Sequence, residues 1–173
     1  CVAGSMLGKY RDGGYAEYIS VPARGVLSLP EEISFEHGAV MMCSSSTSFH
    51  ALRKTALRAG ETVAIFGVGG LGLSAVQLAK AFGALEVYAV DINAKKLKLA
   101  EKYGAIPVNA ARTDPVAEIQ RLTNNRGVDV TLELIGLPQT MHQAVQALAI
   151  FGRAGLVGIT DKPLEIDTYQ ELL

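Results

Sequence analysis

The clearest chemical signal in the sequence is a glycine-rich stretch, Gly67-Val68-Gly69-Gly70-Leu71-Gly72. It follows an apolar run at 62–66 and precedes a helical pattern, which is the context in which G-x-G-x-x-G binds the pyrophosphate of a dinucleotide. Gly67 allows a tight turn, Gly69 lets a phosphate approach the main chain, and Gly72 lets the helix pack closely on the strand. The unpaired N–H groups of the first helical turn would then face the phosphates.

An acidic residue stands at the matching distance from this stretch. Asp91 lies nineteen residues after Gly72, at the end of the next apolar run. A carboxylate there can accept hydrogen bonds from ribose hydroxyls and would repel a 2′-phosphate, so NAD is favoured over NADP. The alternative is a glycine turn in a non-binding α/β protein with an incidental aspartate, and the agreement of strand, loop, helix and acid favours the binding site.

Other residues that could do chemistry give weaker signals when read alone. Cys43 is typical of a small hydrophobic residue buried on a core helix. His50 is typical of a surface or packed histidine. Asp129 and Glu133 lie on one face of a predicted strand and could form an acid pair, although we expect Asp129 to make structural hydrogen bonds. No Ser-His-Asp arrangement at usable spacing is apparent.

The elements that must position these residues alternate regularly from residue 62 onward. Strands are predicted at 62–66, 86–90, 106–108, 128–134 and 154–159. Helices are predicted at 71–83, 94–103, from 115, and at 140–149. Alternating strands and helices with short connections predict an α/β fold, an open parallel sheet of about five strands with helices on both faces.

The preceding residues have a different pattern. Alternating residues at 15–21 and a short run at 27–29 predict two strands that could not bury themselves alone. Ser34 is a candidate N-cap for a helical pattern that runs to about Lys54. We expect an interruption near 44–46, because three consecutive serines compete for the backbone hydrogen bonds of a helix.

Composition excludes several classes of protein. The 173 residues carry a formal net charge of -1, which removes the electrostatic signature of a nucleic-acid or anionic-membrane binder. No apolar stretch reaches the length of a spanning helix, and no signal peptide is visible. Two cysteines are too few for a disulfide scaffold and indicate a reducing, cytoplasmic setting. We expect neither nucleic acid nor a membrane as a partner.

The sequence resembles the medium-chain, zinc-dependent alcohol dehydrogenase family. The resemblance covers essentially the whole chain and is specific in order and spacing. It is carried by segments 12–18, 29–30, 67–72, 127–130 and 152–158, together with Asp91 and with Cys43 four residues before Thr47. In this family a zinc ion polarises an alcohol oxygen while hydride passes to the nicotinamide, so the resemblance implies NAD, zinc, and an alcohol, aldehyde or ketone substrate.

The resemblance also implies roles for single residues. Cys43 would be a protein ligand of the catalytic zinc, and Cys1 would be the last cysteine of a structural zinc lobe. Thr47 would lie beside the nicotinamide as the catalytic residue. The implied cofactor-binding residues are Gly67, Gly69, Gly70, Leu71, Gly72, Asp91, Ile92, Lys96, Val157, Gly158 and Ile159. Among these, Ile92 would cover the adenine, Lys96 would reach the adenosine ribose, Leu71 would pack on the nicotinamide, and Val157 and Ile159 would flank it.

The chain departs from the family in what surrounds it. The family's other zinc ligands would precede Cys1, and a sixth strand would follow Leu173. We therefore expect a fragment, with residues 1–48 from a GroES-like catalytic segment and residues 49–173 from an incomplete NAD-binding domain of Rossmann type. The parent protein would be a homo-oligomeric dehydrogenase, and this chain alone would be inactive. The alternatives are a cofactor-binding module without catalysis and a zinc-free quinone or enoyl reductase of the same fold.

Overall fold

The computed structural model describes residues 6–166 of the chain. It divides into two compact units, Cys1–Gly38 and Ala39–Leu173, and each is described here by itself. The second unit contains the glycine-rich stretch and Asp91. None of the described helices is both long enough and apolar enough to cross a membrane.

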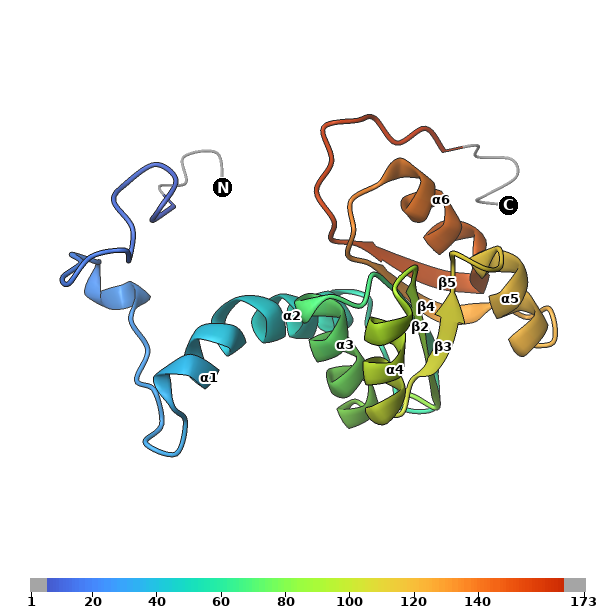
Figure 1. Cartoon of the computed structure of the whole chain (residues 1–173), viewed down its shortest axis with the longest axis horizontal. Helices are drawn as coiled ribbons and strands as arrows, with labels where there is room; N and C mark the ends of the chain where they lie inside the picture. The colour runs from blue at the N-terminus through green and yellow to red at the C-terminus, as the bar shows by residue number, and fades with distance from the viewer. Residues whose placement is uncertain (1–5, 167–173) are drawn as a thin grey trace. The chain divides into compact units, whose positions relative to one another are not determined.

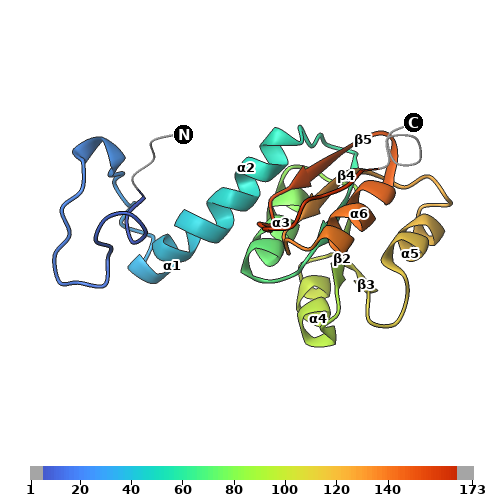
Figure 2. The ribbon, with the colours of Figure 1, turned by 90° about the horizontal axis from the view of Figure 1, so that it is seen from above.

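The second unit is built on a parallel sheet (Figure 1). Its strands within the described residues are β1 (Thr62–Phe66), β2 (Glu86–Asp91), β3 (Ile106–Asn109), β4 (Val128–Glu133) and β5 (Leu148–Leu156). The strand order is β3-β2-β1-β4-β5, so the chain moves outward from β1 in one direction and returns to the other side of β1 after β3. β4 and β5 lie side by side in Figure 2. The predicted α/β class and the parallel five-stranded sheet are confirmed.

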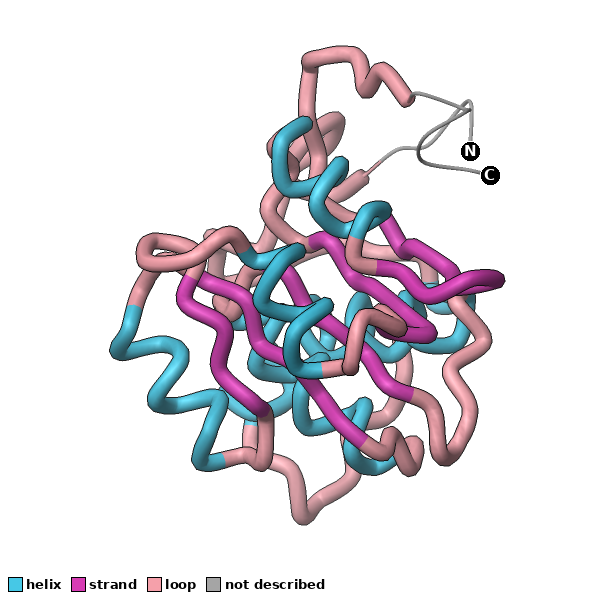
Figure 3. Tube along the Cα trace, turned by 90° about the vertical axis from the view of Figure 1, so that its right-hand side faces the viewer, coloured by secondary structure: helices cyan, strands magenta, loops and turns pink. Residues whose placement is uncertain are grey.

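Helices cover both faces of this sheet, as the cyan and magenta segments of Figure 3 show. They are α2 (Ser46–Lys54), α3 (Gly70–Ala81), α4 (Ala94–Lys102), α5 (Pro115–Leu122) and α6 (Pro138–Gln146). One apolar cluster joins alternate residues of β1, β2 and β4 to α2, α3 and α4. A second cluster joins the other residues of β1 and β2 to α5 and α6. The strands are apolar on both faces because both faces are covered.

Local signals fix most helix starts. Asp114 accepts a hydrogen bond from the N–H of Ala117 at 2.8 Å and precedes Pro115, the first residue of α5. Asn93 accepts from the N–H of Lys95 and Lys96 at the start of α4. These caps confirm the predicted starts of both helices.

The last strand and helix differ from the prediction. α6 ends at Gln146 and β5 begins at Leu148, whereas the sequence pattern predicts a helix to residue 149 and a strand at 154–159. Phe151 adopts a positive φ of 65°, and the pairing of β5 with β4 shifts register between Val128 and Val130. This irregularity hides the early start of the strand from a period-2 pattern. Residues 157–159 consequently lie in the loop after β5.

The helical segment before β1 is continuous where an interruption was expected. A helix α1 (Phe35–Val40) leads into a π-helical turn at Met41–Ser45 and then into α2. The hydroxyl of Ser44 donates to the carbonyl of Val40 at 3.0 Å, and that of Ser46 donates to Met41 at 2.9 Å. The serines therefore widen the helix instead of ending it, which is a known effect of hydroxyls that bond to the preceding turn.

The first unit contains little regular structure. A 3-10 helix at Ala23–Gly25 precedes α1, and Ser34 caps α1 through its hydroxyl, which accepts from the N–H of His37 at 3.3 Å. The strands predicted at 15–21 and 27–29 are wrong, because these residues are irregular in the structure. Alternation supplies an apolar face, but a strand also needs a hydrogen-bonded neighbour, and the described part of this unit offers none for them.

Candidate functional site

The candidate site lies where the strand order reverses. β1 and β4 are neighbours, but β1 leads into α3 on one face of the sheet and β4 leads into α6 on the other. Ligands of open α/β sheets bind in the crevice that forms at the carboxyl ends of two such strands. A cavity of about 570 Å³ opens there, and its lining includes Gly67, Gly69, Gly70, Leu71, Gly72, Asp91, Ile92, Lys96, Ile135 and Thr140.

The glycine loop leaves main chain exposed to this cavity. Gly67 has a φ of +93°, which favours glycine, and a Cβ on Gly72 would lie 2.0 Å from the carbonyl oxygen of Gly67. In contrast, a Cβ on Gly69 or on Gly70 would meet no atom within 4 Å. Gly69 is the N-cap of α3 and provides no side-chain cap, so the first N–H groups of the helix face the cavity without a side-chain partner.

Asp91 braces the glycine loop from the neighbouring strand. Its Oδ2 atom accepts from the N–H of Val68 at 2.9 Å, and its Oδ1 atom accepts from the N–H of Asn93 at 2.8 Å. The residue is 9% exposed, and the Nζ atom of Lys96 lies 3.8 Å from Oδ2. Each carboxylate oxygen can accept a second hydrogen bond, so Asp91 has acceptor capacity left for a hydroxyl in the cavity. Next to it, Ile92 is 72% exposed.

A second hollow, of about 480 Å³, lies between α2 and the end of β5. Thr47 and Val157 line it together, and His50 lines it as well. Ser48 is fully buried beside Thr47, and its hydroxyl lies 2.8 Å from the carbonyl oxygen of Leu71. This contact joins α2 to the first turn of α3. The sequence pattern did not single out Ser48, and its place on the buried face of an amphipathic helix was the available signal.

Cys43 lies in the π-helical turn and is an exposed free cysteine. The interpretation of Cys43 as a buried core residue is therefore wrong. Cys1 lies outside the described residues. Within residues 6–166, no three His, Cys, Asp or Glu side chains come together in a group that could hold a metal ion. The described residues therefore do not form a complete zinc site.

The possible acid pair on β4 does not form. Asp129 is the second residue of β4 and Glu133 is the last, so they lie at opposite ends of the strand. Asp129 accepts from the N–H and the hydroxyl of Thr62 at 2.8 and 2.9 Å and pairs with Arg126. Burial raises the pKa of Asp129, but the hydrogen bonds from Arg126 and Thr62 outweigh burial and lower it. Asp129 thus makes structural hydrogen bonds, as expected.

The loop after β5 approaches the loop after β4. The N–H groups of Val157 and Gly158 donate to the carbonyl oxygen of Glu133 at 2.9 and 3.0 Å. A Cβ on Gly158 would lie 2.1 Å from the nitrogen of Gly136, so the two glycines permit close contact. Ile159 is 93% exposed. The structure therefore gathers the glycine loop, Asp91, Ile92 and Lys96 at one cavity, and it brings Val157 to the hollow beside Thr47.

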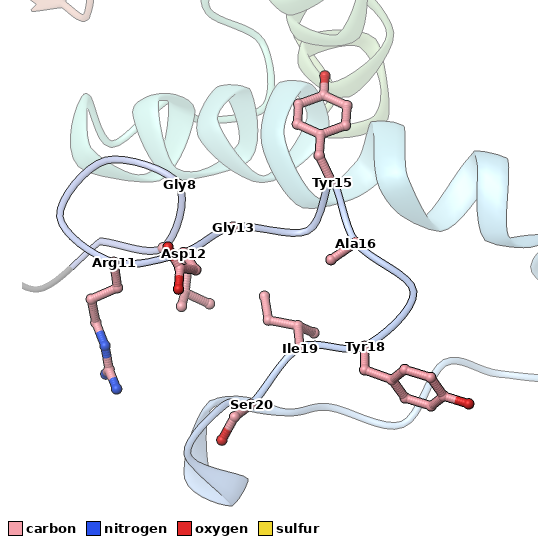
Figure 4. Close-up of a pocket in the computed structure, with 10 residues that line it drawn as sticks. Gly8, Arg11, Asp12, Gly13, Tyr15, Ala16, Tyr18, Ile19 and Ser20 are labelled. Atoms are coloured by element: carbon pink, nitrogen blue, oxygen red, sulfur yellow. The ribbon is translucent and has the colours of Figure 1, made fainter.

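The first unit has a hollow of its own, of about 800 Å³, enclosed by the loop from Leu7 to Ser20 (Figure 4). The rings of Tyr15 and Tyr18 point away from the loop in this view, and both side chains are almost fully exposed. Within the described residues of this unit only Gly38 is buried. The hollow therefore lacks the buried polar groups that would fix a ligand.

Comparison with known proteins identifies relatives of the chain. Residues 70–173 match the family model described as zinc-binding dehydrogenase. The (R,R)-butanediol dehydrogenase of Bacillus subtilis is 40% identical over 155 residues, which are 89% of this chain and 44% of the relative. An alcohol dehydrogenase of Geobacillus stearothermophilus is 38% identical, over 94% of this chain and 47% of the relative.

Solved structures agree with these matches. The crystal structure of 2R,3R-butanediol dehydrogenase from Bacillus subtilis superposes with a TM-score of 0.85 and 39% identity, covering 94% of this chain and 47% of that one. The alcohol dehydrogenase of Aeropyrum pernix gives a TM-score of 0.84 and 39% identity, covering 95% and 49%. The chain thus spans about half the length of the relatives it matches. Because the family model matches more than half of its residues, the chain belongs to the zinc-binding dehydrogenase family.

Proposed function

We propose that this chain binds NAD in the crevice between the glycine loop and Asp91. The observation that carries the proposal is the combination of a bare helix N-terminus at Gly69 and Gly70 with a carboxylate on the next strand. Phosphates are stabilised by unpaired N–H groups and by the positive end of the helix dipole. The carboxylate accepts a ribose hydroxyl and repels a 2′-phosphate.

The other residues take the roles that the family resemblance implies. Ile92, exposed at the rim of the cavity, covers the adenine, and Lys96 reaches the ribose beside it. Leu71 packs on the nicotinamide, while Val157, Gly158 and Ile159 form the wall that flanks it. Thr47 lies beside the nicotinamide. The contact between Ser48 and the carbonyl of Leu71 supports this arrangement, since it places the helix of Thr47 against the helix of Leu71.

The whole protein that contains this chain is proposed to transfer hydride between a primary or secondary alcohol or polyol and NAD. The named activities of the relatives, butanediol, sorbitol and alcohol dehydrogenases, support this class of substrate. Zinc would polarise the alcohol oxygen there, with Cys43 as one thiolate ligand and Cys1 in a structural site. Because residues 6–166 do not complete a zinc site, this chain by itself is proposed to bind cofactor without oxidising alcohol.

The proposed organisation has residues 1–48 as the end of a catalytic segment and residues 49–173 as the cofactor-binding domain. Apolar side chains are exposed around this boundary, at Val40, Met41, Met42 and Phe49. Exposed apolar patches favour association. We therefore propose a homo-oligomer, and light scattering tests it: a monomer across the accessible concentration range would contradict the proposal.

Calorimetric titration with NAD and NADP tests the cofactor assignment. NAD should bind at least about tenfold more tightly than NADP, about 1.4 kcal/mol. Asp91→Gly and the milder Asp91→Asn should narrow this ratio, whereas the control Asp12→Gly, which removes an exposed aspartate of the first unit, should leave it unchanged. Equal affinities in the unmodified chain would defeat the assignment and favour a zinc-free reductase instead.

A further inference from the structure

The proposed function leaves one buried charged group without a role. Glu133 is the last residue of β4 and is fully buried. Its Oε1 atom accepts from the N–H of Ile135 at 3.0 Å, from the N–H of Gly136 at 2.9 Å and from the hydroxyl of Thr140 at 2.7 Å. A buried carboxylate is costly unless it is hydrogen-bonded. Glu133 therefore fixes the loop between β4 and α6 by three convergent bonds.

The same residue also holds the segment after β5. Its main-chain carbonyl accepts from the N–H of Val157 and of Gly158. Its second carboxylate oxygen, Oε2, is buried without a hydrogen-bond partner, and a Cβ on Gly158 would lie 2.5 Å from it. Oε2 thus points at the main chain of Gly158. Five N–H or O–H groups from two loops depend on this one residue.

These two loops lie at the carboxyl ends of β4 and β5, beside the crevice. Ile135 and Thr140 line the cavity of the glycine loop, and Val157 lines the hollow beside Thr47. A Cβ on Gly67 would lie 2.6 Å from the side chain of Ile135, so the loop after β4 also touches the glycine loop. A shift of the loop after β4 would therefore move the far wall of the crevice relative to the phosphate site.

We propose that Glu133 is a positioning residue that fixes the nicotinamide-side wall of the crevice by clamping the loops after β4 and β5 together. It touches neither cofactor nor substrate and acts through Ile135, Gly136, Val157 and Gly158. The inference rests on the proposed function, because it assumes that a nicotinamide dinucleotide occupies the crevice. It predicts that Glu133 matters for the nicotinamide end of the cofactor and little for the adenosine end, which Asp91 holds.

The test compares NAD with ADP-ribose, which lacks only the nicotinamide ring, on the full 173-residue chain. Glu133→Ala should weaken NAD binding about tenfold, about 1.4 kcal/mol, and ADP-ribose binding less than about threefold. Glu133→Gln keeps an oxygen acceptor and should restore NAD affinity to within about threefold. The matched control is Thr131→Val, which removes a buried hydroxyl without a hydrogen-bond partner on the same strand.

Amide hydrogen exchange reads the clamp without a ligand. In Glu133→Ala, the amides of Ile135 and Gly136 should exchange at least about tenfold faster, while those within β2 keep their protection. Thr140→Val removes one of the three donors and provides a milder variant if Glu133→Ala does not fold. It should weaken NAD about threefold and leave ADP-ribose unchanged.

Several results would overturn the inference. Equal losses of NAD and ADP-ribose affinity in the variants would mean general destabilisation, and no loss of either would remove the role. Equal affinity of the unmodified chain for the two ligands would show that the nicotinamide meets no wall. Failure of the unmodified chain to bind ADP-ribose would instead defeat the proposed function, while unchanged exchange at Ile135 and Gly136 would refute the clamp independently.

Discussion

Two glycine-to-alanine substitutions in the same loop should have opposite consequences. At Gly72 a Cβ would lie 2.0 Å from the carbonyl oxygen and 2.9 Å from the carbonyl carbon of Gly67. Gly67 cannot retreat easily, because its N–H donates to the carbonyl of Val90 at 2.8 Å. Gly72→Ala gains up to about 1 kcal/mol of helix propensity. Forcing two main-chain segments apart costs about 1–3 kcal/mol or more. We expect net destabilisation.

Gly69→Ala meets no such obstacle. Gly69 has φ -81° and ψ -156°, which alanine adopts readily, and its Cβ would meet no atom within 4 Å. The free energy of unfolding should therefore change by less than about 0.5 kcal/mol. The new methyl group would occupy the space through which a phosphate approaches the main chain, so NAD affinity should fall at least about tenfold, about 1.4 kcal/mol.

Urea denaturation and calorimetric titration with NAD separate the two effects. The unfolding midpoint should fall for Gly72→Ala and stay constant for Gly69→Ala, with the slope unchanged in both. Gly60→Ala is an unsuitable control because Gly60 has a φ of +87°, whereas Gly14→Ala, in the first unit, adds a Cβ in open space. Wild-type NAD affinity in Gly69→Ala would refute the reasoning, as would equal destabilisation by both substitutions.

Three further substitutions probe the fold and the cofactor choice. Phe151→Gly should stabilise the chain by about 1 kcal/mol in thermal unfolding, because Phe151 has a φ of 65° and a side chain that is 95% exposed; a lower melting temperature would contradict this. Arg153→Met should destabilise by about 1–3 kcal/mol, since Arg153 donates to both carboxylate oxygens of Glu61 and to the carbonyls of Thr55 and Ala56. The hydrogen bond from Arg153 lowers the pKa of Glu61 below its ordinary value of 4.5, so its stabilisation is present above that pH and is lost as the pH falls through the folded-state pKa; urea titrations at stepped pH should show a weaker acid dependence in Arg153→Met, and an unchanged one would refute the pairing. Asp91→Asn should raise NADP affinity relative to NAD in competition experiments, and an unaltered ratio would remove Asp91 from cofactor choice.

The cofactor crevice was predictable because its signals are local. Gly67 and Gly72 answer backbone requirements that no other residue meets, and they stand beside a strand and a helix with strong periodicity. Asp91 follows from strand length and chain order alone. Since these elements pack on both faces of one sheet, their alternation also predicted the parallel topology.

The misses have a common origin in contacts between distant residues. The role of Glu133 depends on Val157 and Gly158, which reach it only after β5 pairs with β4. The early start of β5 is hidden because Phe151 occupies a positive-φ position where a glycine or asparagine would mark a turn. The exposure of Cys43 likewise follows from packing, which a helical pattern around it does not specify.

A crystal structure of the chain with NAD tests the central claim most directly. The account predicts the pyrophosphate within hydrogen-bond distance of the main-chain N–H groups at the start of α3, and a ribose hydroxyl bonded to the carboxylate of Asp91. A dinucleotide bound elsewhere, or one whose phosphates face away from Gly69 and Gly70, would contradict it.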